Sequence, residues 1–283
     1  MKTLLKTRQE LETVGRWDID FHLPPEGIKE FPKELLRRVD AVADVVKDKR
    51  DPSKEPDAPF QYIDISAVDV AVGTIANPQD VEGSEAPSRA RKVVRAFDVI
   101  VSTCRPTRGA IAVVPVSLHD QIASTAFSIV RAHADVNPFY LHFALRLPST
   151  LEQFRKWSTG SSYPAILGSD VNKTLIPVPA LDLQDAIAAR VVAALQERAK
   201  AIRAANRVWG NVLSDITSSL TGKRETAEET EAQDAMQFEA FTLAAVQAAL
   251  DDLPIIRTDA SVNGNGDDVL DSQSRALLDA VSE

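Results

Sequence analysis

Residues 99–104 divide into two faces at a spacing of two, with Val99, Val101 and Thr103 on one and Ile100, Ser102 and Cys104 on the other, and a second run follows over residues 110–116. A spacing of two is typical of β-strands, in which successive side chains point to opposite faces of the sheet. Pro106 and Gly109 lie between the two runs, and these residue types commonly mark turns. The pattern therefore predicts a β-hairpin whose tip lies at residues 105–109.

Periodicity elsewhere predicts the other elements up to residue 180. Leu35, Val39, Val42 and Val46 follow Pro32 at helical spacing, which predicts a helix over 32–50. The further predicted elements are helices over 1–12, 137–147 and 150–157, strands over 61–66 and 175–178, an extended segment over 15–23, a turn near Gly73 and an acidic loop that runs to Pro87. Strands mixed with short helices indicate the α+β class.

The last third of the chain begins with a predicted long helix over 183–220, a stretch without proline. About 38 residues at 1.5 Å each make a rod of roughly 57 Å. Its residues at heptad spacing form a predicted coiled-coil seam, which comprises Val192, Leu195, Ile202, Asn206, Trp209, Leu213, Ile216 and Leu220. A rod cannot bury its own seam, so we expect it to pair with another helix, from this chain or from another copy. Asn206 is the kind of polar residue that sets the register of such a pair.

The residues after this rod are strongly acidic. Gly222 is suited to end the long helix. Residues 225–252 predict a second helix that folds back on the first through Phe238, Phe241 and Leu250, and residues 262–268 have the composition of a flexible linker.

The net charge of the chain is −9, which by itself argues against a nucleic-acid partner. The distribution of charge changes this picture, because residues 85–175 hold 11 Lys and Arg against 6 Asp and Glu, whereas the segments on both sides are acidic. Cations precede the predicted hairpin at Arg89, Arg91, Lys92 and Arg95, and others lie at its tip at Arg105 and Arg108. We expect all six to face solvent or a polyanion. A solvated charged edge that discourages strand aggregation would explain them equally well without a ligand.

Six short pieces, in order along the chain, resemble the target-recognition domain of type I restriction-modification specificity subunits. They are Tyr62-Ile-Asp-Ile-Ser66, Asp98-Val-Ile-Val-Ser102, Gly109-Ala-Ile-Ala-Val-Val114, the run from Ile122 to Arg131, Gly160-Ser-Ser-Tyr163, and Lys173-Thr-Leu-Ile-Pro-Val-Pro179 leading into Gln184 and the long helix. The resemblance spans roughly residues 62–195, and Arg16-Trp17-Asp18 is similar to the start of many such domains. One departure is Phe97, because the family usually has glycine before the aspartate.

The resemblance implies a division of the chain and a set of DNA contacts. Residues 1–54 would be a helical and extended segment of the recognition domain, 55–181 its main part, 182–222 the spacer and dimerisation helix, and 223–283 an acidic, partly flexible helical region. The residues expected to contact DNA are Arg89, Arg91, Lys92, Arg95, Arg105, Thr107, Arg108, Ser161, Ser162, Tyr163 and Lys173. Of these, Arg105, Thr107 and Arg108 are expected nearest the bases, since arginine can bond guanine with two hydrogen bonds. A helix stop and tight loop would explain residues 160–163 without any contact to DNA.

The resemblance also implies partners. They are double-stranded DNA, a separate adenine methyltransferase that uses S-adenosylmethionine, and, in a restriction system, a translocating nuclease subunit. Full-length specificity subunits carry two recognition domains and this chain carries one, so we expect a second copy or another specificity chain and a bipartite target. An open alternative is a defence-system scaffold that keeps the fold but binds protein, for which binding would be insensitive to salt.

Residue patterns that would indicate catalysis or metal binding are weak in this sequence. Asn137-Pro-Phe-Tyr140 resembles the catalytic motif of amino-methyltransferases, but its second proline and an upstream Gly-rich loop are absent, so Asn137 is better explained as a helix cap. The four histidines, His22, His119, His133 and His142, have no partner at metal-ligand spacing. We therefore expect neither an enzyme nor a bound cofactor; a self-sufficient methyltransferase is the third reading. The single cysteine, Cys104, and the lack of a long apolar stretch indicate a soluble cytoplasmic protein without disulfides in the chain.

Overall fold

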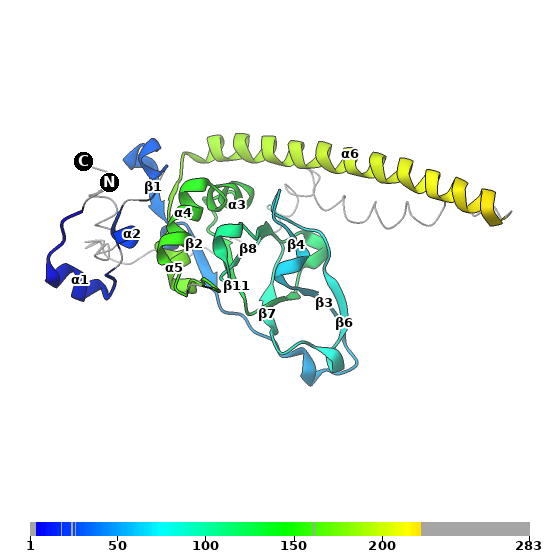
Figure 1. Ribbon diagram of the computed structural model, residues 1–283, viewed down its shortest axis with the longest axis horizontal. Helices are drawn as coiled ribbons and strands as arrows, with labels where there is room; N and C mark the ends of the chain where they lie inside the picture. Colours follow the sequence, from blue (N-terminus) through cyan, green and yellow to red (C-terminus); the bar gives the residue numbers. More distant parts are fainter. Residues whose placement is uncertain (1–3, 18, 24, 26, 161, 222–283) are drawn as a thin grey trace.

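The computed structural model describes residues 4–17, 19–23, 25, 27–160 and 162–221. Two four-stranded sheets and short helices form a body, and a long helix leaves it (Figure 1). The predicted α+β class is confirmed. The predictions for Gly222, residues 225–252 and residues 262–268 lie outside the described residues.

The predicted hairpin is confirmed as β8 (Val99–Ser102) and β9 (Ile111–Val113), which pair antiparallel with Val101 opposite Ile111. They belong to a sheet of order β2-β11-β8-β9, in which β2 is Ala43–Val46 and β11 is Phe127–Ala132. Every residue of β8 is buried, because Val99 and Val101 pack into one hydrophobic cluster and Ile100 into another on the opposite face. The alternation of the sequence thus separates two cores rather than a core from solvent.

The second sheet has the order β6-β3-β10-β7, with β6 (Gln79–Glu82), β3 (Pro59–Ile63), β10 (Gln121–Ser124) and β7 (Ala90–Val94). Strands β3 and β10 are parallel, and the other pairs are antiparallel. The turn near Gly73 joins the short strands β4 (Val68–Asp69) and β5 (Thr74–Ile75). The prediction of an acidic loop up to Pro87 is wrong, because this stretch contains the strand β6, which pairs with β3.

Two predictions for the first 50 residues are wrong. The segment expected to be extended, 15–23, contains the helical turn α2 (Ile19–His22), which follows α1 (Arg8–Val14). The helix expected over 32–50 is absent from this described stretch, which instead holds β1 (Leu36–Arg38), β2 and two single 3-10 turns. Its valines are β-branched and favour strands, and pairing of β2 with the distant β11 decides the outcome.

The helices after the sheets follow the sequence prediction within a few residues. They are α3 (Pro138–Leu145) and α4 (Pro148–Trp157), and the short α5 (Gly168–Lys173) was not predicted. Asn137 caps α3, since its side-chain oxygen accepts from the N–H groups of Phe139 and Tyr140. The predicted strand over 175–178 is β12 (Leu175–Pro177), which pairs with β1.

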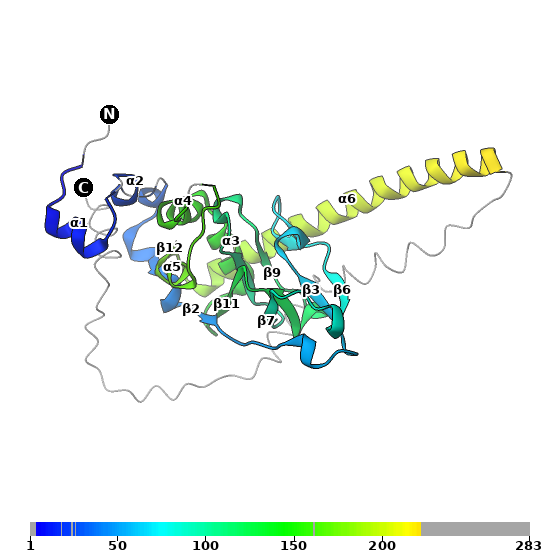
Figure 2. The same ribbon diagram turned by 60° about the horizontal axis from the view of Figure 1, so that its bottom comes forward.

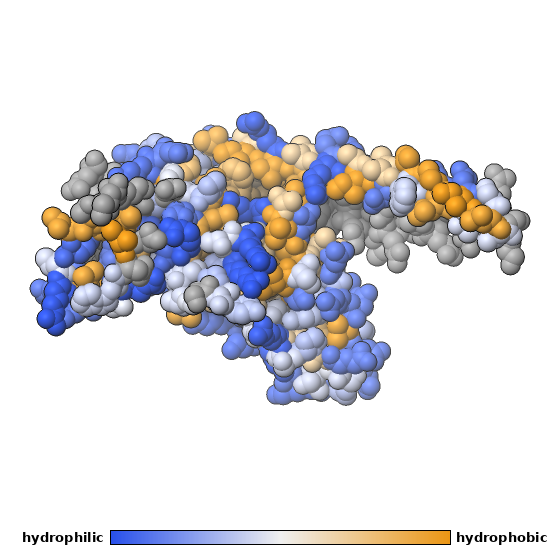
Figure 3. All heavy atoms as spheres, in the orientation of Figure 1, coloured by the Kyte–Doolittle hydropathy of each residue, from blue (hydrophilic) through white to orange (hydrophobic). Residues whose placement is uncertain are grey.

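The predicted long helix is α6 (Leu181–Thr221), and only its first part docks on the body. Gln184, Ala188 and Val192 are buried, and the Gln184 side-chain oxygen accepts from the Asn137 N–H at 3.0 Å. Beyond this base the helix extends away from the sheets (Figures 1 and 2). Beyond the docked base, the exposed large apolar residues of α6 are Ile202, Val208, Trp209, Val212, Leu213, Ile216 and Leu220, and Figure 3 shows apolar side chains along the rod.

Candidate nucleic-acid interface

The hairpin tip is joined to a loop that lies far away in the sequence. The Arg105 N–H donates to the Pro164 carbonyl at 2.7 Å, and the Ile166 N–H donates to the Thr103 carbonyl at 2.9 Å. Thr159 and Ala165 exchange two backbone hydrogen bonds of 2.9 Å, which close the second loop on itself. We call residues 103–109 and 158–166 the paired loops. These backbone hydrogen bonds join two segments that lie far apart in the sequence. Residues of both segments were expected to contact DNA.

Polar and aromatic side chains gather on the paired loops. The Arg105 guanidinium lies over the Tyr163 ring at 4.7 Å from the ring centroid, and Tyr163 is 77% exposed. Thr107, Arg108 and Ser162 are also exposed, whereas Pro106 is buried and anchors the tip. Ser161 lies outside the described residues. The structure therefore brings together the expected contacts Arg105, Thr107, Arg108, Ser162 and Tyr163 on the paired loops.

The four cations before the hairpin lie on or beside β7, and the structure separates them. Arg89 is exposed, and Arg95 is mostly exposed with its guanidinium 3.7 Å from the Asp48 carboxylate. Arg91 is partly buried and pairs with Asp51 at 3.3 Å. Lys92 is half-buried and donates to the Phe127 carbonyl. Burial, with the nearby charge of Lys49, lowers the pKa of Lys92.

The expectation that all six cations face solvent is therefore wrong for Lys92, because its half-buried ammonium donates to the Phe127 carbonyl. Lys173 lies away from the tip on α5, where its ammonium is 3.8 Å from the Asp170 carboxylate. Of the cations expected to contact DNA, Arg89, Arg95 and Arg108 are exposed, whereas Arg105 is partly buried and forms no ion pair within the described residues.

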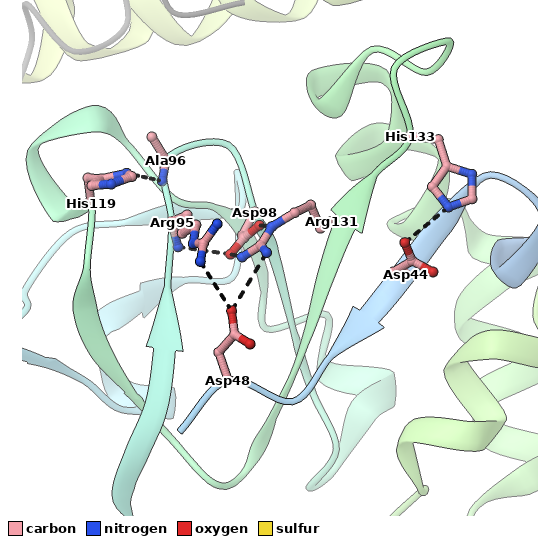
Figure 4. Close-up of polar contacts among 8 residues, drawn as sticks. All are labelled: Asp44, Asp48, Arg95, Ala96, Asp98, His119, Arg131 and His133. Atoms are coloured by element: carbon pink, nitrogen blue, oxygen red, sulfur yellow. Dashed lines mark hydrogen bonds and ion pairs between the residues drawn. The ribbon is translucent and has the colours of Figure 1, made fainter. Parts of the chain in front are cut away.

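A buried ion network supports the root of the hairpin (Figure 4). Asp98 is 1% exposed and accepts from Arg131 Nε at 2.8 Å, Arg131 Nη2 at 2.9 Å and the Arg95 N–H at 2.8 Å. The hydrogen bonds to Asp98 are the main cause that raises the pKa of Arg131. Asp48 adds contacts of 3.7 Å to both Arg95 and Arg131. The network compensates a carboxylate that would otherwise be costly to bury.

Phe97 occupies the position where the family usually has glycine, and its backbone keeps the left-handed conformation that glycine favours, with φ of 69°. Its N–H donates to the Val114 carbonyl at 2.8 Å, and its ring packs on Phe139 of α3 at 5.9 Å between centroids. The departure in sequence thus leaves the turn intact, since ring packing offsets the strain of the backbone.

Arg146 is a positioning residue that sequence reasoning missed. Its guanidinium donates to the carbonyls of Gly109, Ile111, Val70 and Ala71 at 2.9 to 3.2 Å. It therefore joins the end of the hairpin tip to the β4–β5 turn and to α3. Beside it, His142 is buried and bonds the Ile111 carbonyl, and burial lowers the pKa of His142 to about 3.

The predicted coiled-coil seam divides at the edge of the body. Val192 is buried in the main core and Leu195 is partly buried, whereas Ile202, Asn206, Leu213 and Ile216 are exposed, as are Trp209 at 63% and Leu220 at 82%. Val208 and Val212 widen the exposed stripe beyond the predicted heptad positions. Arg198 pairs with Asp69 at 3.2 Å, which ties the rod to the β4–β5 hairpin at the point where it leaves the body.

Within the described residues, no group of three or more His, Cys, Asp or Glu side chains is arranged to hold a metal ion. None of the helices in that part of the chain is long and apolar enough to cross a membrane.

Comparisons with known proteins agree with this fold. No protein-family model matches the chain, and no curated protein matches it. The crystal structure of the HsdS subunit from Thermoanaerobacter tengcongensis is 39% identical, with a TM-score of 0.51, over 64% of this chain and 45% of that one. A chain from a structure on the complex assembly and conformational transition of the type I R-M system is 38% identical, with a TM-score of 0.53, over 66% of this chain and 48% of that one.

This chain thus spans about half the length of the solved relatives it matches. The resemblance predicted from the sequence is confirmed: in sequence and fold, the chain is similar to the HsdS specificity subunits of type I restriction-modification systems.

Proposed function

We propose that this chain recognises a half-site in double-stranded DNA and recruits a separate adenine methyltransferase to it, without catalysing the reaction itself. The observation that carries the proposal is the 39% identity to an HsdS subunit. S-adenosylmethionine would be bound by the methyltransferase, and in a restriction system a translocating nuclease subunit would join the same complex.

Charge and exposure support DNA as the ligand of the paired loops. Arg105 and Arg108 lie at the hairpin tip, in the only net basic third of the sequence, while the rest of the chain is acidic. A phosphate backbone attracts such a tip, and the acidic surroundings disfavour other orientations on the duplex. Arg89 and Arg95, which flank β7, would add contacts to phosphates.

The exposed stripe of α6 supports a helical partner. Trp209, Leu213 and Ile216 are large apolar side chains on a surface that the described residues leave uncovered. Burying them against a second helix would stabilise an assembly. We propose that a second copy, or another specificity chain, pairs with α6, so that two recognition units read a bipartite target at a spacing set by the rod.

The test is DNA binding and methylation by the complex of this chain with its methyltransferase. A half-site selected from random duplexes should bind with an affinity that falls steeply between low and moderate salt, because each phosphate contact releases a counterion. The methylated adenine should lie within or next to that site. Binding without sequence preference, or methylation that continues without this chain, would contradict the proposal.

The second candidate is a protein-binding scaffold of a defence system, which the large exposed stripe on α6 favours. It predicts partner binding that changes little with salt and no selected DNA site. The same salt titration therefore separates the two functions.

A further inference from the structure

We propose that Arg105 reads a guanine of the target half-site, with Tyr163 as the positioning residue that holds its guanidinium in place. This inference rests on the proposed DNA recognition and adds the base that one side chain selects. It depends on three features of the paired loops, which are the backbone of Arg105, its stacking on Tyr163, and its lack of a carboxylate partner.

The backbone of Arg105 is held from both sides in an unusual conformation. Its φ is 48°, and among the described residues only Phe97 and Asp120 share positive φ without being glycine. Its N–H donates to the Pro164 carbonyl at 2.7 Å, and its carbonyl accepts from the Arg108 N–H at 3.0 Å. Non-glycine residues with positive φ persist where the surroundings impose them, and they cluster at functional sites. Arg105 therefore starts from a fixed Cα position.

The side chain is held by an aromatic face rather than by an anion. The guanidinium carbon is 4.7 Å from the centroid of the Tyr163 ring. Stacking uses the flat face of the guanidinium and leaves the N–H groups at its edge able to donate. Arg91, Arg95 and Arg131 each pair with an aspartate, whereas Arg105 forms no ion pair within the described part of the chain. Its donors are thus available to a ligand.

Guanine is the base that matches an edge of parallel N–H donors. Its O6 and N7 both accept hydrogen bonds in the major groove, and arginine can bond the two together. A stacked arginine loses less conformational freedom on binding than a free one, which favours specific recognition over a loose contact to phosphate. A bidentate phosphate contact is the competing outcome, because phosphate offers the same acceptor geometry without sequence information.

The experiment uses the complete chain with its methyltransferase and compares duplexes carrying each base at every position of the selected half-site. Wild-type protein should prefer guanine at one position by roughly 5- to 150-fold. Replacing that guanine by 7-deazaguanine, which lacks the N7 acceptor, should lower wild-type affinity. Arg105→Ala should lose the preference at this position alone and become insensitive to 7-deazaguanine. Arg105→Lys should lose most of it.

Tyr163 variants test the positioning role. Tyr163→Phe keeps the ring and should retain the preference, whereas Tyr163→Ala should weaken it at the same position, with unchanged thermal unfolding. Arg89→Ala is the matched control, since Arg89 is exposed just before β7 and its loss should lower affinity for all sequences equally.

A uniform loss for Arg105→Ala at every sequence, or no position that responds to 7-deazaguanine, would overturn the guanine assignment while leaving DNA recognition standing. Absence of any selected half-site for the wild-type complex would overturn both.

Discussion

Asp98 offers a sharp test of what supports the hairpin. Asp98→Asn keeps the size of the side chain but removes the charge that faces Arg131, with which it makes hydrogen bonds of 2.8 and 2.9 Å. Breaking a buried pair at one partner costs about 3–5 kcal/mol, and partial exposure of Arg131 with its second contact to Asp48 reduces this to about 2–3 kcal/mol.

The assay is urea unfolding of the purified chain. The free energy of unfolding of the variant is compared with that of the wild type, and the dependence of this free energy on urea concentration should be the same for both. Asp120→Asn is the matched control, because Asp120 also loses a charge, faces Arg50 at 3.3 Å and is exposed. Asparagine tolerates its φ of 60°, and an exposed pair of this kind contributes only about 0–1 kcal/mol. Equal, small losses for the two variants would refute the role assigned to the Asp98 network.

Three further predictions test other parts of the structure. Arg146→Ala should lower the free energy of unfolding by about 2–4 kcal/mol, because four backbone carbonyls lose a charged donor. The same change should loosen the hairpin tip and weaken DNA binding. Unchanged binding by a folded variant would contradict this. His142 has a folded pKa of about 3, below its unfolded value, so the unfolded chain binds the extra proton and stability should fall as pH drops from about 6.5 towards 3. His142→Gln should flatten that slope in urea titrations across the window, and an identical slope would exclude His142 as its cause. Trp209→Asp with Leu213→Asp should shift sedimentation of the chain to the single-copy mass, whereas Asn211→Asp, at an exposed position on the other side of the helix from the apolar stripe, should leave the assembly intact.

Local patterns predicted the hairpin, α3, α4 and α6 because the turn, cap and periodicity signals of each element lie within its own segment. Val99 and Val101 alternate with Ile100 in the sequence, and the structure places them in separate clusters. Helical spacing was misleading over 32–50. There Val39, Val42 and Val46 fit a helix by their spacing, but the stretch forms a 3-10 turn and the strand β2, which pairs with the distant β11. Such pairing carries no local signal.

The candidate site was predicted in part for a similar reason. The resemblance placed both Arg105 and Tyr163 in the recognition domain, but only the fold shows that one stacks on the other. The Asp98–Arg131 pair was missed, although an acid and a base next to otherwise apolar strands are a signal that could have indicated a buried pair. Arg146 gave no such signal, because all four of its acceptors are main-chain carbonyls.

The most direct test of the central claim is methylation of the selected site by the complex carrying Arg105→Glu and Arg108→Glu together. Both residues lie on the tip and neither belongs to α6, so the variant should still assemble with the methyltransferase and a second chain. The account predicts that this assembled complex no longer methylates its site at moderate salt. Methylation at the wild-type rate would show that the paired loops do not contact the duplex.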